Sequence, residues 1–539
     1  MTKKEWKLLS ENFDTWLSDH IVLNDYQQQC LTHFSQKYQS GQNRFLFGLK
    51  MGLGKTYTAL EFAKSLNQDN WIIICKPNLV NQWIKSYVQI FKKTNIFIID
   101  QVKGEYELLD ILLNQNDQTQ KVFFVSYDRI KKVFDLMFKN HLYDDPRIKL
   151  NIILDESQVL KNHSSGISKM FLKMNQYFHH LLLLSGSLIS NDAHQLFTQY
   201  KLLLNLHEKK YSFSYFVSEY FGWKELKISK TKTIMVPDSI ILSKAVGLLN
   251  KLHEVSFFKS NENLFENKIN YIQLQSDQTH QNDELLKTLK NDGIYHFENF
   301  FCVFNTPVMR ANKIKQYFNG YLYGYNVPVE EQQQFIGEIN NQQMLMELEQ
   351  YVNGISTSNL NEQQLLFVKN YSPMKLYFKD SLKLILLEIF LNESQENFIM
   401  FYNEYGEKDV ISYVAKKCHY QIFIIDSNKV SVNELLEQVK QVIKKEKIII
   451  LIQTTVGSVG IDGLQHYFNN VIWFQLPFSY EKWDQANARV YRIGQKENVN
   501  IYYLTTNIID EKIYERLCHA QDYNEMIWSN DITKLLDNI

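Results

Sequence analysis

The stretch RFLFGLKMGLGKTYTALEFA (residues 44–63) decides the fold, because it runs from an apolar strand through a glycine-rich turn into a helix-forming segment. Such a turn points consecutive backbone N–H groups at phosphate oxygens at a helix N-terminus. The strict form of this pattern has a glycine at position 49, where this sequence has Leu49, with Gly48 displaced by one. The turn predicts a triphosphate and Mg²⁺ site, with Lys55 as the cation for the β- and γ-phosphates and Thr56 as a hydroxyl for the metal. Its residues are Gly52, Leu53, Gly54, Lys55 and Thr56.

Short apolar runs separated by helix-like segments occur in two regions of the chain, which is typical of strands buried on both faces of a parallel sheet. The first region predicts strands at 44–47, 71–75, 95–100, 121–127, 151–156 and 180–187. The second predicts strands at 397–402, 420–426, 447–453, 470–476 and 498–504. We therefore expect an α/β protein with two parallel-sheet lobes.

The run NIILDES places Asp155 and Glu156 directly after a buried strand, about 100 residues beyond the phosphate-binding turn. Asp155 is suited to hold Mg²⁺, in part through its water shell, and Glu156 to orient and deprotonate an attacking water. The two adjacent carboxylates therefore have separate predicted roles in nucleotide hydrolysis.

In the second region, DQANARVYRIGQ places Arg489 and Arg492 three residues apart, on one face if the segment is helical. Such a pair is suited to neutralise charge that develops on a transferred phosphoryl group. A phosphate-binding turn in one lobe and arginines in the other predict an ATPase whose lobes close on ATP and Mg²⁺.

The segment between the two regions is charged and amide-rich, and two stretches (277–293 and 330–352) have apolar positions at helical spacing. We predict a mostly helical insertion there. The expected divisions are an N-terminal segment (1–20), lobe one (21–205), the insertion and linker (206–370), lobe two (371–515) and a tail (516–539).

Composition excludes several classes of protein. The 539 residues include 58 basic and 59 acidic side chains, so any site for a polyanion must be local. The 5 cysteines form no Cys-x-x-Cys pair, which argues against a disulfide framework and a cysteine zinc site. The apolar runs are too short to span a bilayer. We expect a cytoplasmic protein that uses neither zinc nor a membrane.

A set of ordered motifs resembles the Swi/Snf-type ATPases of helicase superfamily two, over roughly residues 20–515. The set comprises LNDYQ (23–27), MGLGKT (51–56), PNLVNQW (77–83), FVSYD (124–128), DESQVLKN (155–162), LLLLSGSLISN (181–191), TTVGSVGIDGLQ (454–465) and QANARVYRIGQ (485–495). These are similar, in order, to the family's glutamine motif and motifs I, Ia, Ib, II, III, V and VI. The RIGQ ending distinguishes this family from DEAD-box RNA helicases.

The resemblance implies two RecA-like lobes and an ATPase that tracks along double-stranded DNA, usually without separating its strands. By the same resemblance, Gln27 reads adenine, Gly460 and Arg492 contact the nucleotide, and Ser185, Ser187 and Gln485 couple the lobes. Weaker assignments to the DNA phosphate backbone are Lys76, Gln82, Ser126 and Thr455. Replication or repair proteins are expected partners, and the lean architecture suggests a bacterial or phage-infected cell.

Four departures from the family pattern stand out. Gln158 occupies the histidine position of motif II, and Leu188 replaces a proline in motif III. In SFFKSNENL (256–264), two phenylalanines occupy the place of an arginine pair in what we read as a helical segment. Motif V carries about two extra residues.

Two alternatives to a duplex translocase remain open at this point. One is a strand-separating helicase on DNA or RNA, of which the RIGQ ending argues against RNA; single-stranded DNA is a second candidate partner. The other is a nucleotide-dependent scaffold that binds DNA and hydrolyses ATP too slowly to move.

Overall fold

The structure is a computed structural model. It describes residues 13–19, 21–68, 70–99, 102–113, 121–141, 149–206, 211–227, 233–260, 267–275, 284–291, 293–304, 307–333, 335, 347–348, 360–426, 432–457, 463–492 and 494–528. The chain divides into two compact units, Met1–Leu264 with Cys518–Ile539, and Phe265–Leu517. Lobe one is predicted to end at residue 205, so the first unit extends further along the chain than that lobe.

The first unit is built on a parallel sheet with the strand order β3-β4-β2-β5-β6-β1-β9. Its strands are β1 (Arg44–Leu49), β2 (Trp71–Ile74), β3 (Ile96–Ile99), β4 (Val122–Val125), β5 (Leu150–Leu154), β6 (Phe178–Leu184) and β9 (Ser256–Lys259). The strands expected from the apolar runs of the first region are confirmed. The sequence analysis missed β9.

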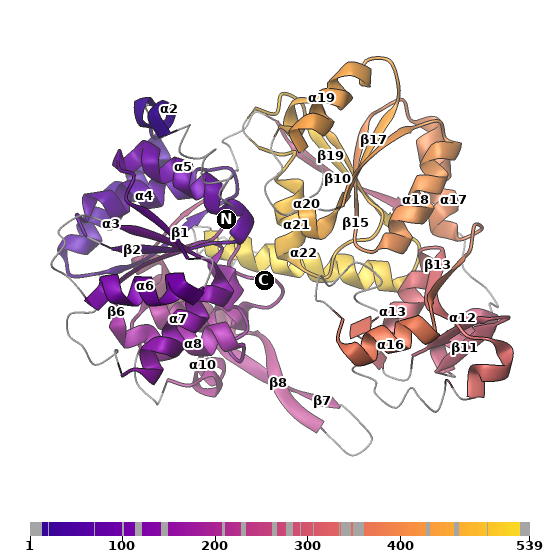
Figure 1. Ribbon diagram of the computed structural model, residues 1–539, viewed down its shortest axis with the longest axis horizontal. Coiled ribbons are helices and arrows are strands. Elements are labelled where there is room, and N and C mark those ends of the chain that lie inside the picture. The colour runs from indigo at the N-terminus through magenta and orange to yellow at the C-terminus, as the bar shows by residue number, and fades with distance from the viewer. Residues whose placement is uncertain are drawn as a thin grey trace. The chain divides into compact units, whose positions relative to one another are not determined.

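Helices cover both faces of this sheet (Figure 1). One layer contains α2 (Phe13–Ser18), α3 (Asp25–Gln39), α4 (Lys55–Ser65), η1 (Pro77–Leu79) and α5 (Val80–Phe91). The other contains α6 (Val102–Leu113), α7 (Tyr127–Lys139), η3 (Ser157–Leu160), α8 (Gly166–Met174), η4 (Asn175–Tyr177), η5 (Ala193–Leu196), α9 (Phe197–Leu203), α10 (Phe213–Tyr220) and α11 (Leu242–Glu254). Along β1, Phe45 and Phe47 enter the first layer and Leu46 the second, which explains why this strand reads as uninterrupted apolar sequence.

The strand β9 corrects our interpretation of SFFKSNENL, because Ser256–Lys259 is a strand rather than part of a helix. It pairs in parallel with β1, and its two phenylalanines pack on opposite faces of the sheet. A Cβ atom at Gly48 would lie 2.1 Å from Cδ1 of Phe258. Gly48 is therefore required by the packing of β9.

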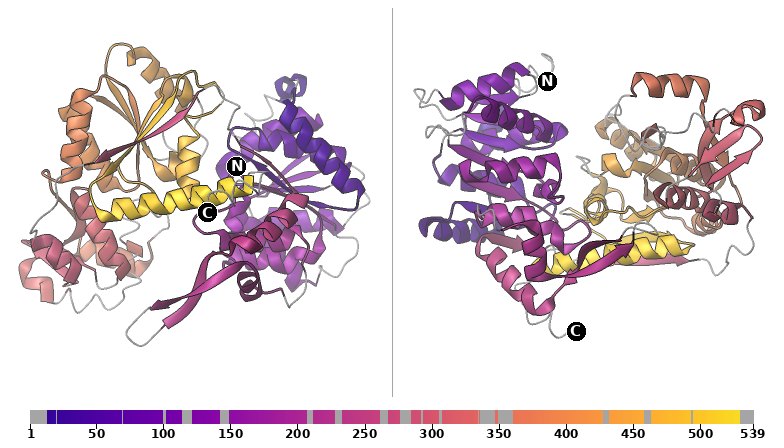
Figure 2. Two further views of the ribbon diagram at one scale, coloured as in Figure 1. Left: turned by 180° about the vertical axis from the view of Figure 1, so that it is seen from behind. Right: turned by 90° about the horizontal axis from the view of Figure 1, so that it is seen from below.

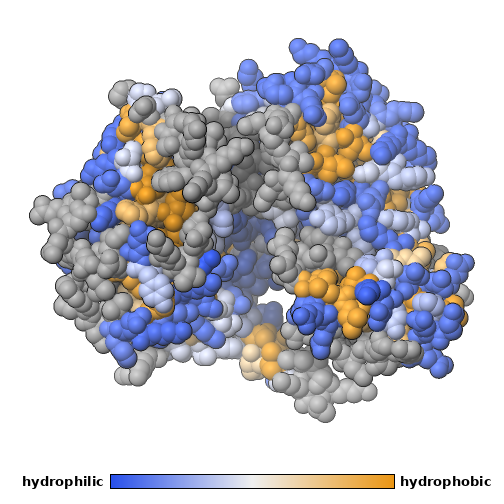
Figure 3. Space-filling view, viewed as in Figure 1, coloured by the Kyte–Doolittle hydropathy of each residue, from blue (hydrophilic) through white to orange (hydrophobic). Residues whose placement is uncertain are grey.

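A two-stranded antiparallel ribbon, β7 (Phe221–Lys227) and β8 (Thr233–Ile240), also belongs to the first unit. Large apolar side chains on it are exposed, namely Trp223, Leu226 and Met235 at 37%, 50% and 54%. Apolar surface lies along the ribbon in Figure 3.

The second unit contains a parallel sheet with the order β10-β19-β18-β15-β17-β16. Its strands are β10 (Ile269–Gln275), β15 (Phe398–Tyr402), β16 (Gln421–Ile425), β17 (Ile448–Gln453), β18 (Asn470–Trp473) and β19 (Val499–Thr505). Around it lie α17 (Leu382–Glu393), α18 (Tyr405–Lys417), α19 (Val432–Val442), α20 (Thr454–Gly457), η7 (Leu464–His466), α21 (Tyr480–Asn487) and the part of α22 (Ile508–Trp528) that ends at Leu517. The strands predicted for the second region are confirmed, while β10 was missed.

The prediction of a mostly helical insertion is wrong for several described segments between 206 and 370, which form the ribbon, β9, β10 and part of an antiparallel sheet. That sheet has the order β11-β12-β13-β14, and Figure 2 shows it from two further sides. Its parts are α12 (Glu284–Asn291), β11 (Ile294–Phe297), β12 (Phe300–Val303), α13 (Pro307–Phe318), β13 (Tyr321–Asn326), η6 (Val329–Glu331), α16 (Glu362–Asn370) and β14 (Pro373–Tyr377). The expected helix at 277–293 corresponds to α12, and most of 330–352 lies outside the described residues.

The antiparallel sheet joins the lobe through β13 and through a buried ion pair. Tyr321 packs in the core of the lobe and Leu322 in that of the antiparallel sheet. Lys383 of α17 is fully buried; its Nζ donates to Asp510 Oδ1 at 2.9 Å and to Asn319 Oδ1 at 3.1 Å. These contacts connect the insertion, α17 and α22 in one polar network.

We predict that Gly48→Ala lowers the free energy of unfolding by about 1–3 kcal/mol, because the added methyl group overlaps the Phe258 ring. Phe258→Leu should reduce the cost of Gly48→Ala. The matched control is Gly247→Ala in α11, where a Cβ atom meets nothing within 4 Å, so a gain of about 0.5–1 kcal/mol is expected. Thermal unfolding curves of Gly48→Ala, Phe258→Leu, the double variant of these two and Gly247→Ala test this, and equal effects at the two glycines would contradict it.

Lys383→Met should destabilise the second unit by about 3–5 kcal/mol, because it leaves the buried Asp510 carboxylate without its cation. Lys440→Met breaks an exposed pair with Glu437 and should cost no more than about 0.5 kcal/mol. Chemical denaturation followed by tryptophan fluorescence measures both. A small effect at Lys383 would mean that the pair does not hold the insertion in place.

Candidate nucleotide site

The predicted motifs of the first unit meet at the carboxyl edge of its sheet. Strands β4, β2, β5, β6 and β1 are consecutive neighbours, and they lead into Ser126, Lys76, Asp155, Ser185 and the phosphate-binding turn respectively. Ligands of open parallel sheets bind at this edge. Segments more than 100 residues apart in the chain therefore form one site.

The phosphate-binding turn has the backbone that its glycines predict. Gly52 and Gly54 have φ values of 82° and 72°, in the left-handed region that glycine adopts without steric cost. Gly54 caps the N-terminus of α4, which begins at Lys55. The Lys55 ammonium group donates to the Leu49 carbonyl at 3.0 Å. A turn, a helix N-terminus and a lysine thus lie together as a phosphate site requires.

The glutamine motif contacts this turn directly. Gln27 is 4% exposed; its Nε2 donates to the carbonyls of Leu53 at 3.2 Å and Gly54 at 3.4 Å. Its Oε1 accepts from the Asn24 N–H at 2.8 Å. A Cβ atom at position 54 would lie 2.4 Å from Gln27 Nε2, so this contact also requires a glycine. Adenine recognition by Gln27 stays a prediction; the structure shows that this side chain holds the turn.

Asp155 lies in a buried and strongly hydrogen-bonded position beyond β5. Its Oδ2 accepts from the Trp83 indole N–H at 2.9 Å, and its Oδ1 from the Glu156 N–H at 3.0 Å. The Tyr127 hydroxyl donates to its backbone carbonyl at 2.8 Å. Burial, followed by the charge of Glu156, raises the pKa of Asp155 to about 6, while Trp83 and Lys55 act in the opposite direction. A nearby cation would favour the ionised carboxylate.

Glu156 adopts a left-handed backbone with φ of 48°, which is uncommon for a residue with a side chain. Its Oε2 accepts from Nε2 of Gln158, the residue at the histidine position of motif II. Gln158 Oε1 in turn accepts from Ser185 Oγ at 2.7 Å. The carboxylate predicted to activate water is therefore connected to motif III through one side chain.

The turn after β6 packs against the phosphate-binding turn. A Cβ atom at Gly186 would lie 3.0 Å from Met51 Cγ and 3.2 Å from Lys55 Nζ. Leu188, where the family has proline, is fully buried in the core of the second helical layer. Motif III therefore contacts motifs I and II within one unit.

These residues fit an Mg²⁺–triphosphate. The two positive-φ glycines leave backbone exposed at the N-terminus of α4, beside Lys55. Thr56 and Asp155 supply the hydroxyl and carboxylate oxygens that Mg²⁺ prefers, with the substrate phosphates completing its ligands. We therefore place ATP and Mg²⁺ at this edge as a proposal developed below.

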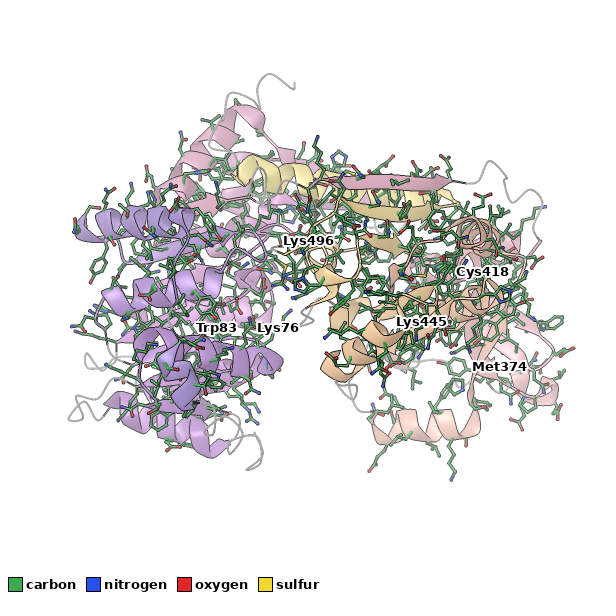
Figure 4. All side chains as sticks on the ribbon, turned by 90° about the horizontal axis from the view of Figure 1, so that it is seen from above. Lys76, Trp83, Met374, Cys418, Lys445 and Lys496 are labelled. Carbon is green, nitrogen blue, oxygen red and sulfur yellow. The ribbon has the colours of Figure 1, made fainter. Side chains whose placement is uncertain are left out.

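Two of the residues assigned to DNA lie at the same edge. Lys76 and Ser126 follow the paired strands β2 and β4 and are partly exposed. Figure 4 shows Lys76 at the margin of the unit and Trp83 within it. Gln82 is exposed on α5, and Thr455 is exposed on α20 of the second unit. Their DNA contacts stay predictions.

The arginines of motif VI require a correction. Their spacing places them on one face only if the segment is helical, but α21 ends at Asn487, and Arg489 and Arg492 lie in the turns that follow it. Both are partly buried, whereas Gln485 is buried within α21. Gly460 lies outside the described residues. The roles of these residues in nucleotide binding and lobe coupling stay predictions.

Three contributors to the site are not among the predicted site residues: Trp83, Tyr127 and Gln158. Trp83 and Tyr127 belong to motifs Ia and Ib, which were assigned only to DNA, yet both donate hydrogen bonds to Asp155. Gln158 was noted as a departure without a role. The sequence carries no signal for the contacts of Trp83 and Tyr127 with Asp155, or of Ser185 with Gln158, because each joins segments that are distant in the chain.

Matches to known families agree with this arrangement. Residues 20–186 match the family described as type III restriction enzyme, res subunit, and residues 380–494 match the helicase conserved C-terminal domain. The fold and the site define a P-loop ATPase core of the helicase type with two RecA-like lobes.

Two curated relatives are similar to this chain. The ATP-dependent helicase FUN30 of Saccharomyces cerevisiae is 23% identical over 93% of this chain and 46% of its own length. The SWI/SNF-related matrix-associated actin-dependent regulator of chromatin subfamily A-like protein 1 homolog of Caenorhabditis elegans is 30% identical over 31% of this chain and 23% of its own length. This chain is thus similar to proteins named as an ATP-dependent helicase and as SWI/SNF-related, as its ordered motifs predict.

A solved structure is also similar, the Sulfolobus solfataricus SWI2/SNF2 ATPase core in complex with dsDNA. It is 16% identical, covers 95% of this chain and 94% of its own, and has a TM-score of 0.37. This chain spans less than half the length of the curated relatives described above.

The bacterial or phage setting and the cytoplasmic location stay predictions. Within the described residues, no helix is long and apolar enough to cross a membrane.

Trp83→Phe should raise the Mg²⁺ concentration needed for half-maximal ATP hydrolysis by roughly 10-fold, because it removes a hydrogen bond that orients Asp155. Trp71→Phe makes the same change in buried β2, where the ring packs beside His180, and should leave the requirement unchanged. Mg²⁺ titrations of ATPase activity measure both. Equal shifts in the two variants would show that packing, rather than the bond to Asp155, is responsible.

Proposed function

We propose that this chain is a double-stranded DNA-stimulated ATPase that moves along duplex DNA. The observation that carries the proposal is the meeting of Lys55, the Asp155–Glu156 pair and the Ser185–Ser187 turn at one sheet edge. A phosphate cation, a metal-binding carboxylate and a candidate base in one place support hydrolysis of a nucleoside triphosphate. Bound Mg²⁺ would supply charge neutralisation at the phosphates.

Each residue of the site has a chemical task in this proposal. The backbone N–H groups of the turn and the Lys55 ammonium bind and orient the phosphates. Thr56 and Asp155 hold Mg²⁺, and Trp83 keeps the Asp155 carboxylate in place. Glu156 orients the attacking water and takes its proton at a carboxylate oxygen. Gln27 connects adenine recognition to the turn that it supports.

The second unit contributes arginines in this proposal. Arg489 and Arg492 act on the phosphates when the lobes close on ATP, and Gln485 and Gly460 belong to the same set. The support is the match of residues 380–494 to the helicase C-terminal domain, together with motif VI in this sequence. Alternate closing and reopening would turn hydrolysis into movement.

DNA is proposed to run along residues that contact its backbone without reading sequence. Lys76, Gln82, Ser126 and Thr455 offer the ammonium, amide and hydroxyl groups that commonly bind phosphates. Relatives include a protein named as an ATP-dependent helicase and the mouse DNA excision repair protein ERCC-6-like. We therefore propose that the translocase remodels or strips protein–DNA complexes in replication, recombination or repair.

The test is steady-state ATP hydrolysis without nucleic acid and with duplex DNA, single-stranded DNA or RNA. We expect duplex DNA to raise the rate by at least about 10-fold, and Lys55→Ala to abolish both the basal and the stimulated rate. Displacement of a third strand from a triplex by the wild type would then show tracking. Equal rates under all four conditions would contradict DNA coupling.

Glu156→Gln separates a motor from a scaffold. It keeps the shape of the side chain but removes the base, so hydrolysis should fall by at least about 100-fold while ATP binding persists. Triplex displacement should stop with it. If displacement continued unchanged in this variant, Glu156 would not be the base that drives the motor.

A further inference from the structure

Gln158 is held at both ends of its carboxamide. It is 1% exposed; its Nε2 donates to Glu156 Oε2, and its Oε1 accepts from Ser185 Oγ at 2.7 Å. Glu156 Oε2 accepts this hydrogen bond, so the amide nitrogen of Gln158 faces Glu156. That leaves the amide oxygen for Ser185 and determines which way round the carboxamide lies.

Ser185 has two acceptors for one proton. Its fully buried hydroxyl lies 2.7 Å from Gln158 Oε1 and 2.6 Å from the Ser187 carbonyl oxygen. A hydroxyl group donates one hydrogen bond, and neither oxygen can donate in return. Leaving a buried acceptor unpaired costs about 1–3 kcal/mol. The hydroxyl proton therefore has two alternative positions, and only one of them secures Gln158.

The turn that contains Ser185 and Ser187 also contacts the phosphate-binding turn. Gly186 approaches Met51 and Lys55 so closely that no Cβ atom fits without displacing them. A change in this turn that moves the Ser187 carbonyl would transfer the Ser185 hydrogen bond to Gln158. Contacts at the phosphates and the orientation of Gln158 are thus connected through three consecutive residues.

We propose that Gln158 is a positioning residue that holds the Glu156 carboxylate in the orientation for water activation, and that Ser185 controls how firmly it does so. When Ser185 donates to Gln158, the carboxamide is fixed at both ends and Glu156 keeps an oriented donor. When Ser185 donates to Ser187, the amide oxygen loses its donor and the carboxamide is free to turn. The proposal rests on the proposed function, because it takes Glu156 as the base.

Another buried hydrogen bond of motif II provides a matched control. Ser157 Oγ donates to Gln199 Oε1 at 3.0 Å, and both side chains are at least 99% buried. Ser157 is adjacent to Glu156 in the chain, but its hydrogen bond runs to α9 instead of to the carboxylate. Ser157→Ala should therefore lower stability without the specific loss of turnover expected at Gln158.

The experiment measures kcat and KM for ATP with saturating duplex DNA in Gln158→Glu, Gln158→His, Ser185→Ala, the Gln158→Glu/Ser185→Ala double variant and Ser157→Ala. Gln158→Glu keeps the shape but replaces the donor by an acceptor, so kcat should fall at least about 30-fold with KM changed less than about 3-fold. Ser185→Ala alone should lower kcat about 10-fold. In the double variant, kcat should be less than about 2-fold below that of Gln158→Glu, because Ser185 acts on Glu156 through Gln158. Gln158→His restores a donor and an acceptor and should stay within about 3-fold of wild type.

Several results would overturn the proposal. Independent, multiplicative losses in the double variant would show that Ser185 does not act through Gln158. A loss in Ser157→Ala equal to that in Gln158→Glu would assign the effect to stability, and thermal unfolding of each variant checks this directly. If Gln158→Glu does not fold, the kcat values of Gln158→His and Ser185→Ala decide: losses in both as large as about 30-fold would reject the proposal. A wild type without ATPase activity rejects the proposed function itself, whereas an active wild type with unaffected variants rejects only the role of Gln158.

Discussion

The parallel alignment of β5 between β2 and β6 is the constraint on which the site depends. It places the ends of three strands side by side. Asp155 accepts a hydrogen bond from Trp83 of α5, the helix that follows β2, and Gln158 connects Glu156 to Ser185 at the end of β6. The strand hydrogen bonds are backbone contacts and hold these ends in a constant register. Largely apolar strands, buried on both faces, stabilise the sheet against the cost of bringing carboxylates together.

Glycines allow the neighbouring loops to approach this edge. Gly54 leaves space for Gln27, and Gly186 leaves space for Met51 and Lys55. Gly48 belongs to a different part of the structure, since it admits the Phe258 ring from β9. The phosphate-binding turn is therefore supported by the glutamine motif, by motif III and by a strand that lies 200 residues further along the chain.

The second unit is organised around buried polar contacts between its parallel sheet and the antiparallel sheet inserted before it. Lys383, Asn319 and Asp510 come from three segments that are distant in sequence. Replacing such a network by apolar residues is often neutral for stability, but breaking it is costly. The network consequently favours one position of the insertion against the parallel sheet. The apolar contacts come from β13, where Tyr321 packs in the core of the lobe and Leu322 in that of the antiparallel sheet.

The sequence by itself determined the phosphate-binding turn, the positions of most strands along the chain in both lobes and the acidic pair, because each of these depends on residues that are neighbours in the chain. Only the tertiary structure decided that SFFK is an edge strand, that the insertion contains an antiparallel sheet, that Arg489 and Arg492 lie beyond α21, and that Gln158 connects Glu156 to Ser185. The physical reason is the same in each case. A short aromatic or apolar run fits a helix or a strand according to what packs against it, and a hydrogen bond between strand ends has no signature within either strand.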